Sequence, residues 1–224
     1  MTLALPLRLE LEHSQPALPA DRRSAPMLLV EAALTGDLVA TQQLLASVTP
    51  RMTRVVHAVL GSAHADVDDV VQQALIGFLQ ALPSFRGECE PVSFASRIAV
   101  RAAVAAARRT WQARGRREDD VDLDTLASST EYAADRFAEA SRLKEVLRDL
   151  LSRIPAEQAE AMALRFVLGW SLEEVSRVTG APVNTVRSRV RLAKKALRTA
   201  IEVDPVLAEE LGVVRHDPTN RNDT

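Results

Sequence analysis

The chain has 224 residues, of which 47% are hydrophobic and 26% charged, and its formal net charge is −2. That length corresponds to one or two domains, and the hydrophobic fraction is sufficient for packed cores. A single cysteine, Cys89, excludes an intramolecular disulfide framework and suits a reducing compartment. The most apolar stretch, 98–107, is interrupted by Arg101, and the N-terminus makes a poor signal peptide. We therefore expect a cytoplasmic protein.

The composition predicts an all-α fold. Ala, Leu, Arg and Glu are abundant, glycines number only eight, and β-branched runs are few. The small net charge hides an uneven distribution along the chain. Residues 91–117 contain seven arginines and no acid, residues 118–149 contain ten acids against four basic residues, and residues 182–198 contain six basic residues and no acid. Two basic helices separated by an acidic stretch are therefore expected.

The first part of the chain divides into an arm and a helical domain. Residues 1–26 hold four prolines and no sustained period, so we expect a disordered N-terminal arm. A helical pattern then runs through 27–112, interrupted by Gly, Pro and Asp. The expected helices lie near 27–34, 38–48, 51–60, 66–82 and 92–112, with breaks at 35–37, 49–50, 61–62 and 83–91.

The second part of the chain predicts a tethered helical domain. Residues 113–140 are polar and rich in Asp, which favours a flexible acidic linker. A second domain follows at 141–201, and a frayed tail at 202–224. The expected helices lie near 141–152, 156–168, 172–178 and 183–200.

Residues 171–198 have the layout of a helix-turn-helix. Ser171 and Glu174 have the spacing of a capping box, in which each side chain satisfies a free backbone N–H at the helix start. Thr179-Gly180 ends this short helix, and Pro182 suits the start of the next. A short capped helix, a tight turn and a longer basic helix together are typical of a DNA-binding motif.

The longer helix of this motif has two distinct faces. Val186, Val190, Ala193 and Leu197 form one apolar stripe at helical spacing. Asn184 and the Arg and Lys residues lie largely on the other side. An ordinary solvated face is the alternative interpretation, but such faces mix signs, and this one has no acid. The pattern favours DNA binding.

Three segments resemble the bacterial sigma-70 family, specifically its group-IV (extracytoplasmic-function) members. They are DVDDVVQQALIGFLQALPSFRG (66–87), RIAVRAAVAAARR (97–109) and IPAEQAEAMALRFVLGWSLEEVSRVTGAPVNTVRSRVRLAKKAL (154–197). The first two are similar to region 2 of the family and the third to region 4. The resemblance implies a protein that binds core RNA polymerase through its β′ and β subunits, directs it to promoter DNA, and opens the −10 element.

The resemblance also implies sites. Contacts to the −35 duplex would come from Asn184, Thr185, Arg187, Ser188, Arg189, Arg191, Lys194 and Lys195. Contacts to the melted −10 strand would come from Phe85, Arg86, Phe94, Arg97, Arg101, Arg108 and Arg109. Contacts to core polymerase would come from Asp69, Gln72, Gln73 and Gln80. Pro91, Phe94 and Arg101 depart from the family, which often has an aromatic residue, Trp and Asn there, and Leu192 replaces a common Arg.

Several alternatives stay open at this point. Phe85 and Phe94 can equally belong to the core, and the polar face of 66–82 can be merely solvated. The whole chain can be a stand-alone helix-turn-helix regulator, or a sigma-like protein that titrates an anti-sigma factor, a partner that the family commonly has. We expect no enzyme, cofactor, metal or small-molecule substrate, because the four histidines lie in separate segments and no metal-ligand spacing occurs.

Overall fold

The computed structural model describes residues 25–61, 64–115 and 151–203. The predictions for the N-terminal arm, most of the acidic linker, most of the helix at 141–152 and most of the tail lie outside these residues. Every regular element in the described part of the chain is helical, as the composition predicts. The elements are α1 (Ala25–Leu34), α2 (Leu38–Leu60), α3 (Val67–Ala81), the 3₁₀ turn η1 (Leu82–Ser84), α4 (Pro91–Gly115), α6 (Ala156–Met162), the π-helical segment η2 (Ala163–Val167), α7 (Leu172–Thr179) and α8 (Val183–Val203).

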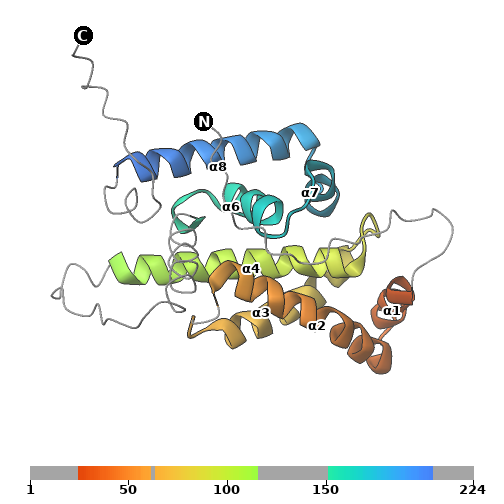
Figure 1. Cartoon of the computed structure of the whole chain (residues 1–224). Helices are drawn as coiled ribbons and strands as arrows, with labels where there is room; N and C mark the ends of the chain where they lie inside the picture. The colour runs from red at the N-terminus through yellow and green to blue at the C-terminus, as the bar shows by residue number, and fades with distance from the viewer. Residues whose placement is uncertain (1–24, 62–63, 116–150, 204–224) are drawn as a thin grey trace, which may run out of the picture.

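The first helical block consists of α1 to α4 (Figure 1). Its three long helices pack on one another, and α1 lies against the start of α2. Leu44 and Met52 of α2, Phe78 of α3 and Val100 of α4 are fully buried where these helices meet. Because each helix turns an apolar stripe inward, the polar residues of α3 and the arginines of α4 are placed at defined positions around this core.

The predicted break at Thr49-Pro50 is wrong, because α2 runs without interruption from Leu38 to Leu60 with Pro50 inside it. A proline within a helix costs about 3 kcal/mol through the lost N–H and a clash with the preceding turn. Leu44 and Val48 before the proline, and Met52 and Val55 after it, are completely buried on one stripe. Burial of each such side chain contributes about 1.5–3 kcal/mol, which exceeds the cost of the exposed proline.

The other turn signals act as the sequence predicts. Gly36 has a φ of 92°, which a residue with a side chain rarely adopts, and it separates α1 from α2. Asp37 then caps α2, because its carboxylate accepts hydrogen bonds from the backbone N–H groups of Val39 (2.8 Å) and Ala40 (3.0 Å). Gly61, with a φ of 81°, ends the same helix. These local signals determine where α2 begins and ends.

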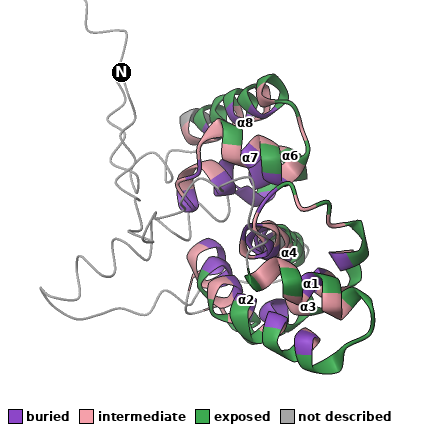
Figure 2. Ribbon diagram, turned by 90° about the vertical axis from the view of Figure 1, so that its right-hand side faces the viewer, coloured by how far each residue is buried: buried purple, intermediate pink, exposed green. Residues whose placement is uncertain are grey.

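The second helical block, residues 151–203, lies against the first (Figure 2). Its helices α6 and α7 contact α4, while α8 packs on α6 and α7 on their other side (Figure 1). One continuous apolar core includes residues of both blocks, among them Val104 of α4 and Leu151, Ile154 and Trp170 of the second block. The helix α4 is therefore covered by helices of both blocks. This contact between the two predicted domains does not follow from the sequence patterns.

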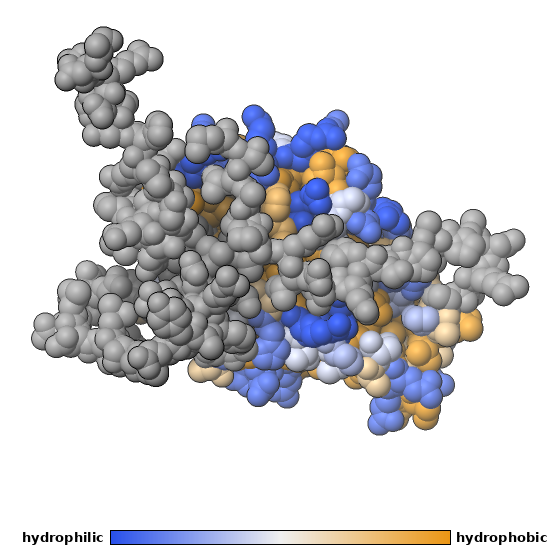
Figure 3. Space-filling view, in the orientation of Figure 1, coloured by the Kyte–Doolittle hydropathy of each residue, from blue (hydrophilic) through white to orange (hydrophobic). Residues whose placement is uncertain are grey.

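None of the described helices is both long and apolar enough to cross a membrane. Hydrophilic residues project from the upper edge of the molecule, over α8 (Figure 3).

Truncation of one leucine in α2 tests whether the buried apolar side chains on either side of Pro50 stabilise the fold. Leu44→Ala removes a side chain with no exposed area and should lower the free energy of unfolding by about 2–5 kcal/mol. Leu38→Ala, in the same helix but 78% exposed, is the control and should change it by less than about 0.5 kcal/mol. Urea unfolding followed by circular dichroism measures both values, and equal effects would contradict the burial assigned to α2.

Candidate nucleic-acid interface

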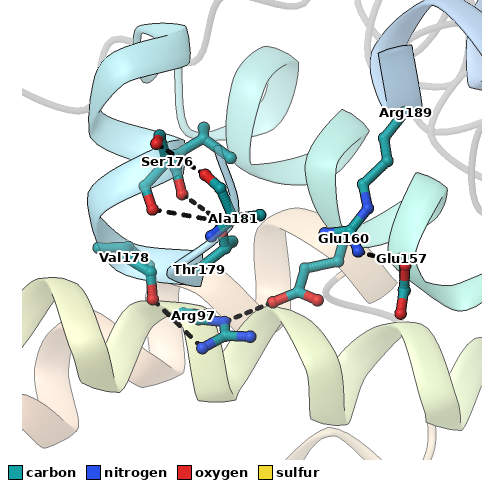
Figure 4. Close-up of polar contacts among 9 residues, drawn as sticks. Arg97, Glu157, Glu160, Ser176, Val178, Thr179, Ala181 and Arg189 are labelled. Atoms are coloured by element: carbon teal, nitrogen blue, oxygen red, sulfur yellow. Dashed lines mark hydrogen bonds and ion pairs between the residues drawn. The ribbon is translucent and has the colours of Figure 1, made fainter. Parts of the chain in front are cut away.

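The turn between α7 and α8 is fixed by local hydrogen bonds (Figure 4). The predicted capping box is present: the Glu174 N–H donates to Ser171 Oγ (3.1 Å), and the Ser171 N–H donates to Glu174 Oε2 (2.7 Å). The helix ends at Gly180, whose φ of 67° is left-handed. Across the turn, the Ser176 hydroxyl donates to the carbonyl of Ala181 at 2.7 Å. These contacts set the angle at which α8 leaves the turn.

The helix α8 has one buried and one exposed face, as its sequence predicts. Val186, Val190, Ala193 and Leu197 are buried against the rest of the second block. The opposite face is solvent-exposed and contains no acidic residue between 182 and 198. Its exposed residues are Asn184, Thr185, Arg187, Arg191, Lys194, Lys195 and Arg198, while Ser188 and Arg189 are half-buried. This arrangement can hold phosphates and reach base edges in a groove.

Individual residues of this face differ in what they already contact. The Arg187 Nη1 donates to the side-chain oxygen of Asn184 at 2.5 Å, which orients an exposed guanidinium. Arg189 forms an ion pair with Glu157 of α6. The ammonium of Lys194 lies 4.6 Å from the ring centroid of Phe166, a cation–π distance. Of these three groups, Arg187 is the one whose partner lies on the same exposed face, so its guanidinium stays at the surface.

The five arginines predicted to bind the −10 strand fall into two sets. Arg86, in the loop before α4, and Arg101 and Arg109 of α4 are exposed. Arg97 and Arg108 are half-buried, and both donate hydrogen bonds to the second block. The structure thus leaves three of the five predicted strand-binding arginines exposed and engages the other two within the chain.

The two predicted stacking residues of the −10 set pack on one another. The rings of Phe85 and Phe94 lie 5.0 Å apart between centroids, and Phe94 is 6.2 Å from the buried Phe78. Both Phe85 and Phe94 are partly buried against the core. Their observed contacts are those of core residues, which is the alternative that the sequence left open. Trp170, which precedes the capping box, is buried in the core.

The exposed face of α3 contains an apolar residue that the sequence analysis did not single out. Asp69, Gln72, Gln73 and Gln80 are all exposed, and their spacing places them on one side of the helix. Ile76 continues the same spacing and is 50% exposed. The spacing of 69, 72, 73, 76 and 80 could have identified Ile76 as a member of this face.

Comparison with known proteins identifies both blocks. The family model "Sigma-70 region 2" matches residues 44–113, and the model "Sigma-70, region 4" matches residues 144–197. The extracytoplasmic-function (ECF) RNA polymerase sigma-E factor of Escherichia coli K12 is 32% identical over 184 residues, which cover 78% of this chain and 93% of that protein. The chain belongs to the sigma-70 family. It is a sigma factor of the extracytoplasmic-function type, as the sequence resemblance implies.

Further relatives are more distant. The sigma-E factor of Haemophilus influenzae is 29% identical over 148 residues, which cover 61% of this chain and 75% of that protein. Among solved structures, CnrH in complex with the cytosolic domain of CnrY is 22% identical, with a TM-score of 0.44, and covers 79% of this chain and 97% of that chain. The sigma factor RpoE in complex with the anti-sigma factor NepR from Bartonella quintana is 23% identical, with a TM-score of 0.42, and covers 73% of this chain and 97% of that chain.

Sigma factors are transcription initiation factors and not enzymes, which agrees with the expectation from sequence. Among the described residues, no group of three or more His, Cys, Asp or Glu side chains is arranged to hold a metal ion.

Burial raises the pKa of the Cys89 thiol to about 11, so the thiol stays protonated at neutral pH. A protonated thiol is a poor nucleophile.

The reactivity of Cys89 should therefore report unfolding of the sigma factor. At pH 8 the buried, protonated thiol should react with iodoacetamide at least about tenfold more slowly than in urea-unfolded protein. Mass spectrometry measures the labelling. Equal rates in folded and unfolded protein would show that Cys89 is accessible.

The raised pKa of Cys89 also links the free energy of unfolding to pH. Because the pKa is raised on folding, the contribution of Cys89 to this free energy is complete below the unfolded pKa and is lost as the pH rises through about 11.

Proposed function

We propose that this sigma factor binds core RNA polymerase through the exposed face of α3, reads the −35 element as duplex through α8, and holds the melted −10 strand against α4. The observation that carries the proposal is the exposed, acid-free basic face of α8 at a rigid turn. Family membership implies core polymerase, promoter DNA and an anti-sigma factor as partners. A protein that contacts promoters in this way acts in the cytoplasm.

Strand opening in this proposal is binding and not a reaction. The region that holds unpaired bases more tightly than paired ones shifts the equilibrium toward the open promoter. The exposed Arg86, Arg101 and Arg109 supply charge for the phosphates of that strand. Phe85 and Phe94 are in contact in the loop and first turns of α4, so stacking on a base requires one ring to leave the other.

The face of α3 favours a sigma factor over a stand-alone DNA-binding regulator. The exposed Ile76 is surrounded by the four polar residues that the family resemblance assigns to contact with core polymerase, whereas the opposite side of α3 is buried in the first block. A regulator that only binds duplex DNA has no use for such a surface. A sigma-like protein that merely titrates an anti-sigma factor would bind DNA or core polymerase without starting transcription.

Run-off transcription with purified core polymerase, on promoters from the genome that encodes the chain, tests the proposal. The wild-type chain should direct specific transcripts. Ile76→Glu should weaken binding to core by tenfold or more, that is by about 1.4 kcal/mol or more, because a charge is desolvated at the interface. Ala46→Glu, at an exposed position of α2, is the matched control and should leave binding unchanged. Binding to core without any transcript would favour the titrating protein.

Replacement of Arg187 tests duplex recognition separately. A bidentate Arg–base contact discriminates by about 1–3 kcal/mol. Arg187→Ala should therefore weaken binding to a −35 duplex and flatten discrimination at one base pair. Arg54→Ala, an exposed arginine of α2, should alter neither property. Fluorescence anisotropy against a panel of single-base variants measures both, and an unchanged base preference would remove Arg187 from the recognition set.

A further inference from the structure

A leucine lies on the basic face of α8. Leu192 is 42% exposed, whereas the other apolar residues between Val186 and Leu197 are buried or half-buried. At about 100° per residue, Leu192 lies roughly 50° from the direction opposite to the buried stripe of the helix. A single exposed leucine is common on protein surfaces. Leu192 is informative because its side chain shares the outward face of α8 with cations and no acid.

The neighbours of Leu192 on this face are uncharged on one side and basic on the other. An uncharged strip runs along the helix at spacings of three, four and seven residues and consists of Thr185, Ser188, Leu192 and Thr199. Lys195, Arg191 and Arg187 are exposed along one edge of this uncharged strip. The helix therefore presents an apolar side chain directly beside a row of positive charges.

The row of charges indicates which partner can cover Leu192. A surface that buries this leucine also approaches Arg187, Arg191 and Lys195, and a cation that loses its water needs an anionic partner. The major groove of DNA combines the two requirements, because phosphates line its walls and base edges form its floor. Its width of about 12 Å accepts an α-helix. Duplex DNA thus fits this face by both shape and charge.

A leucine side chain can recognise one feature of the groove floor. It has neither a hydrogen-bond donor nor an acceptor, so it cannot read the amino, carbonyl and ring-nitrogen groups of the bases. The 5-methyl group of thymine is the one apolar group that the four standard base pairs present there. A base that places an amino or carbonyl group against the leucine loses hydrogen bonds to water without replacement.

We propose that Leu192 contacts the 5-methyl group of a thymine in the −35 duplex and so selects a T·A pair at that position. This inference rests on the proposed recognition of duplex by α8, and it adds an apolar contact to the polar ones proposed there. Leu192 follows Arg187 by five residues, an axial distance of about 7.5 Å or roughly two base-pair steps. The two residues therefore contact different base pairs of the same element.

Replacement of thymine by deoxyuridine tests the contact, because it removes the methyl group and keeps every hydrogen-bonding group of the base. The full-length chain bound to core polymerase first selects a duplex from a pool with about 20 randomised base pairs. Each thymine of the selected duplex is then replaced singly, and fluorescence anisotropy measures binding. At one thymine the replacement should weaken binding of the wild-type chain about fourfold, the effect of one buried methyl group.

Variants of Leu192 show whether the methyl group is read by this side chain. In Leu192→Ala the same replacement should change binding by less than about 1.5-fold, because the apolar partner is gone. Leu192→Met keeps an apolar side chain and should retain the dependence on the methyl group. Leu38→Ala, which removes an exposed leucine of α2, is the matched control and should also retain it. Circular dichroism confirms that each variant is folded.

The outcomes separate this inference from the proposed function. Binding that depends on Arg187, with no thymine whose methyl group matters to wild type but not to Leu192→Ala, would overturn the inference and leave duplex recognition intact. Leu192→Ala that weakens binding to core polymerase but keeps the methyl dependence would also overturn it, because Leu192 would then contact protein. If no duplex is enriched over core polymerase alone, duplex recognition by α8 fails and the inference fails with it.

Discussion

Burial of α4 on two sides is the constraint on which the rest of the molecule depends. Small side chains make it possible: Ala95, Ala99, Ala103, Ala106 and Ala107 are each at most 3% exposed. Alanines favour the helix intrinsically and let neighbouring helices approach closely. As a result α2 and α3 pack on one side of α4, while α6 and α7 pack on another. A helix covered in this way has little exposed surface. Each of its arginines must either extend to solvent between the packed helices or form hydrogen bonds within the protein.

Electrostatics divides the arginines of the two basic helices. On α8 the basic face points away from the protein, so its charges are solvated and attract polyanions over a distance set by the ionic strength. On α4 two of the arginines meet a carboxylate and several carbonyls in a partly dry interface, where interactions are stronger and less screened. The net charge of −2 reflects none of this, because the placement of each charge, and not the total, decides what it can bind.

The sequence predicts local structure well here and long-range contacts poorly. The capping box at Ser171, the turn at Gly180 and the buried stripe of α8 depend on residues within one or two helical turns of each other, and all are confirmed. The predicted helix break at Pro50 was wrong, because the cost of a proline inside α2 is outweighed by packing of α2 against other helices. A local sequence pattern does not reveal that packing. The contacts of Arg97 with Glu160 and of Arg108 with Ile154 span 63 and 46 residues. Nothing in the spacing of either arginine distinguishes it from the exposed Arg101.

This difference decides which basic residues a polyanion can reach in the observed structure. Arg101 and Arg109 of α4 and the basic face of α8 are exposed, so a phosphate can approach them directly. Arg97 and Arg108 already donate hydrogen bonds to Glu160 and to carbonyls of the second block. A phosphate that contacts Arg97 must therefore replace a buried ion pair, and the free energy for that exchange has to come from the new contacts.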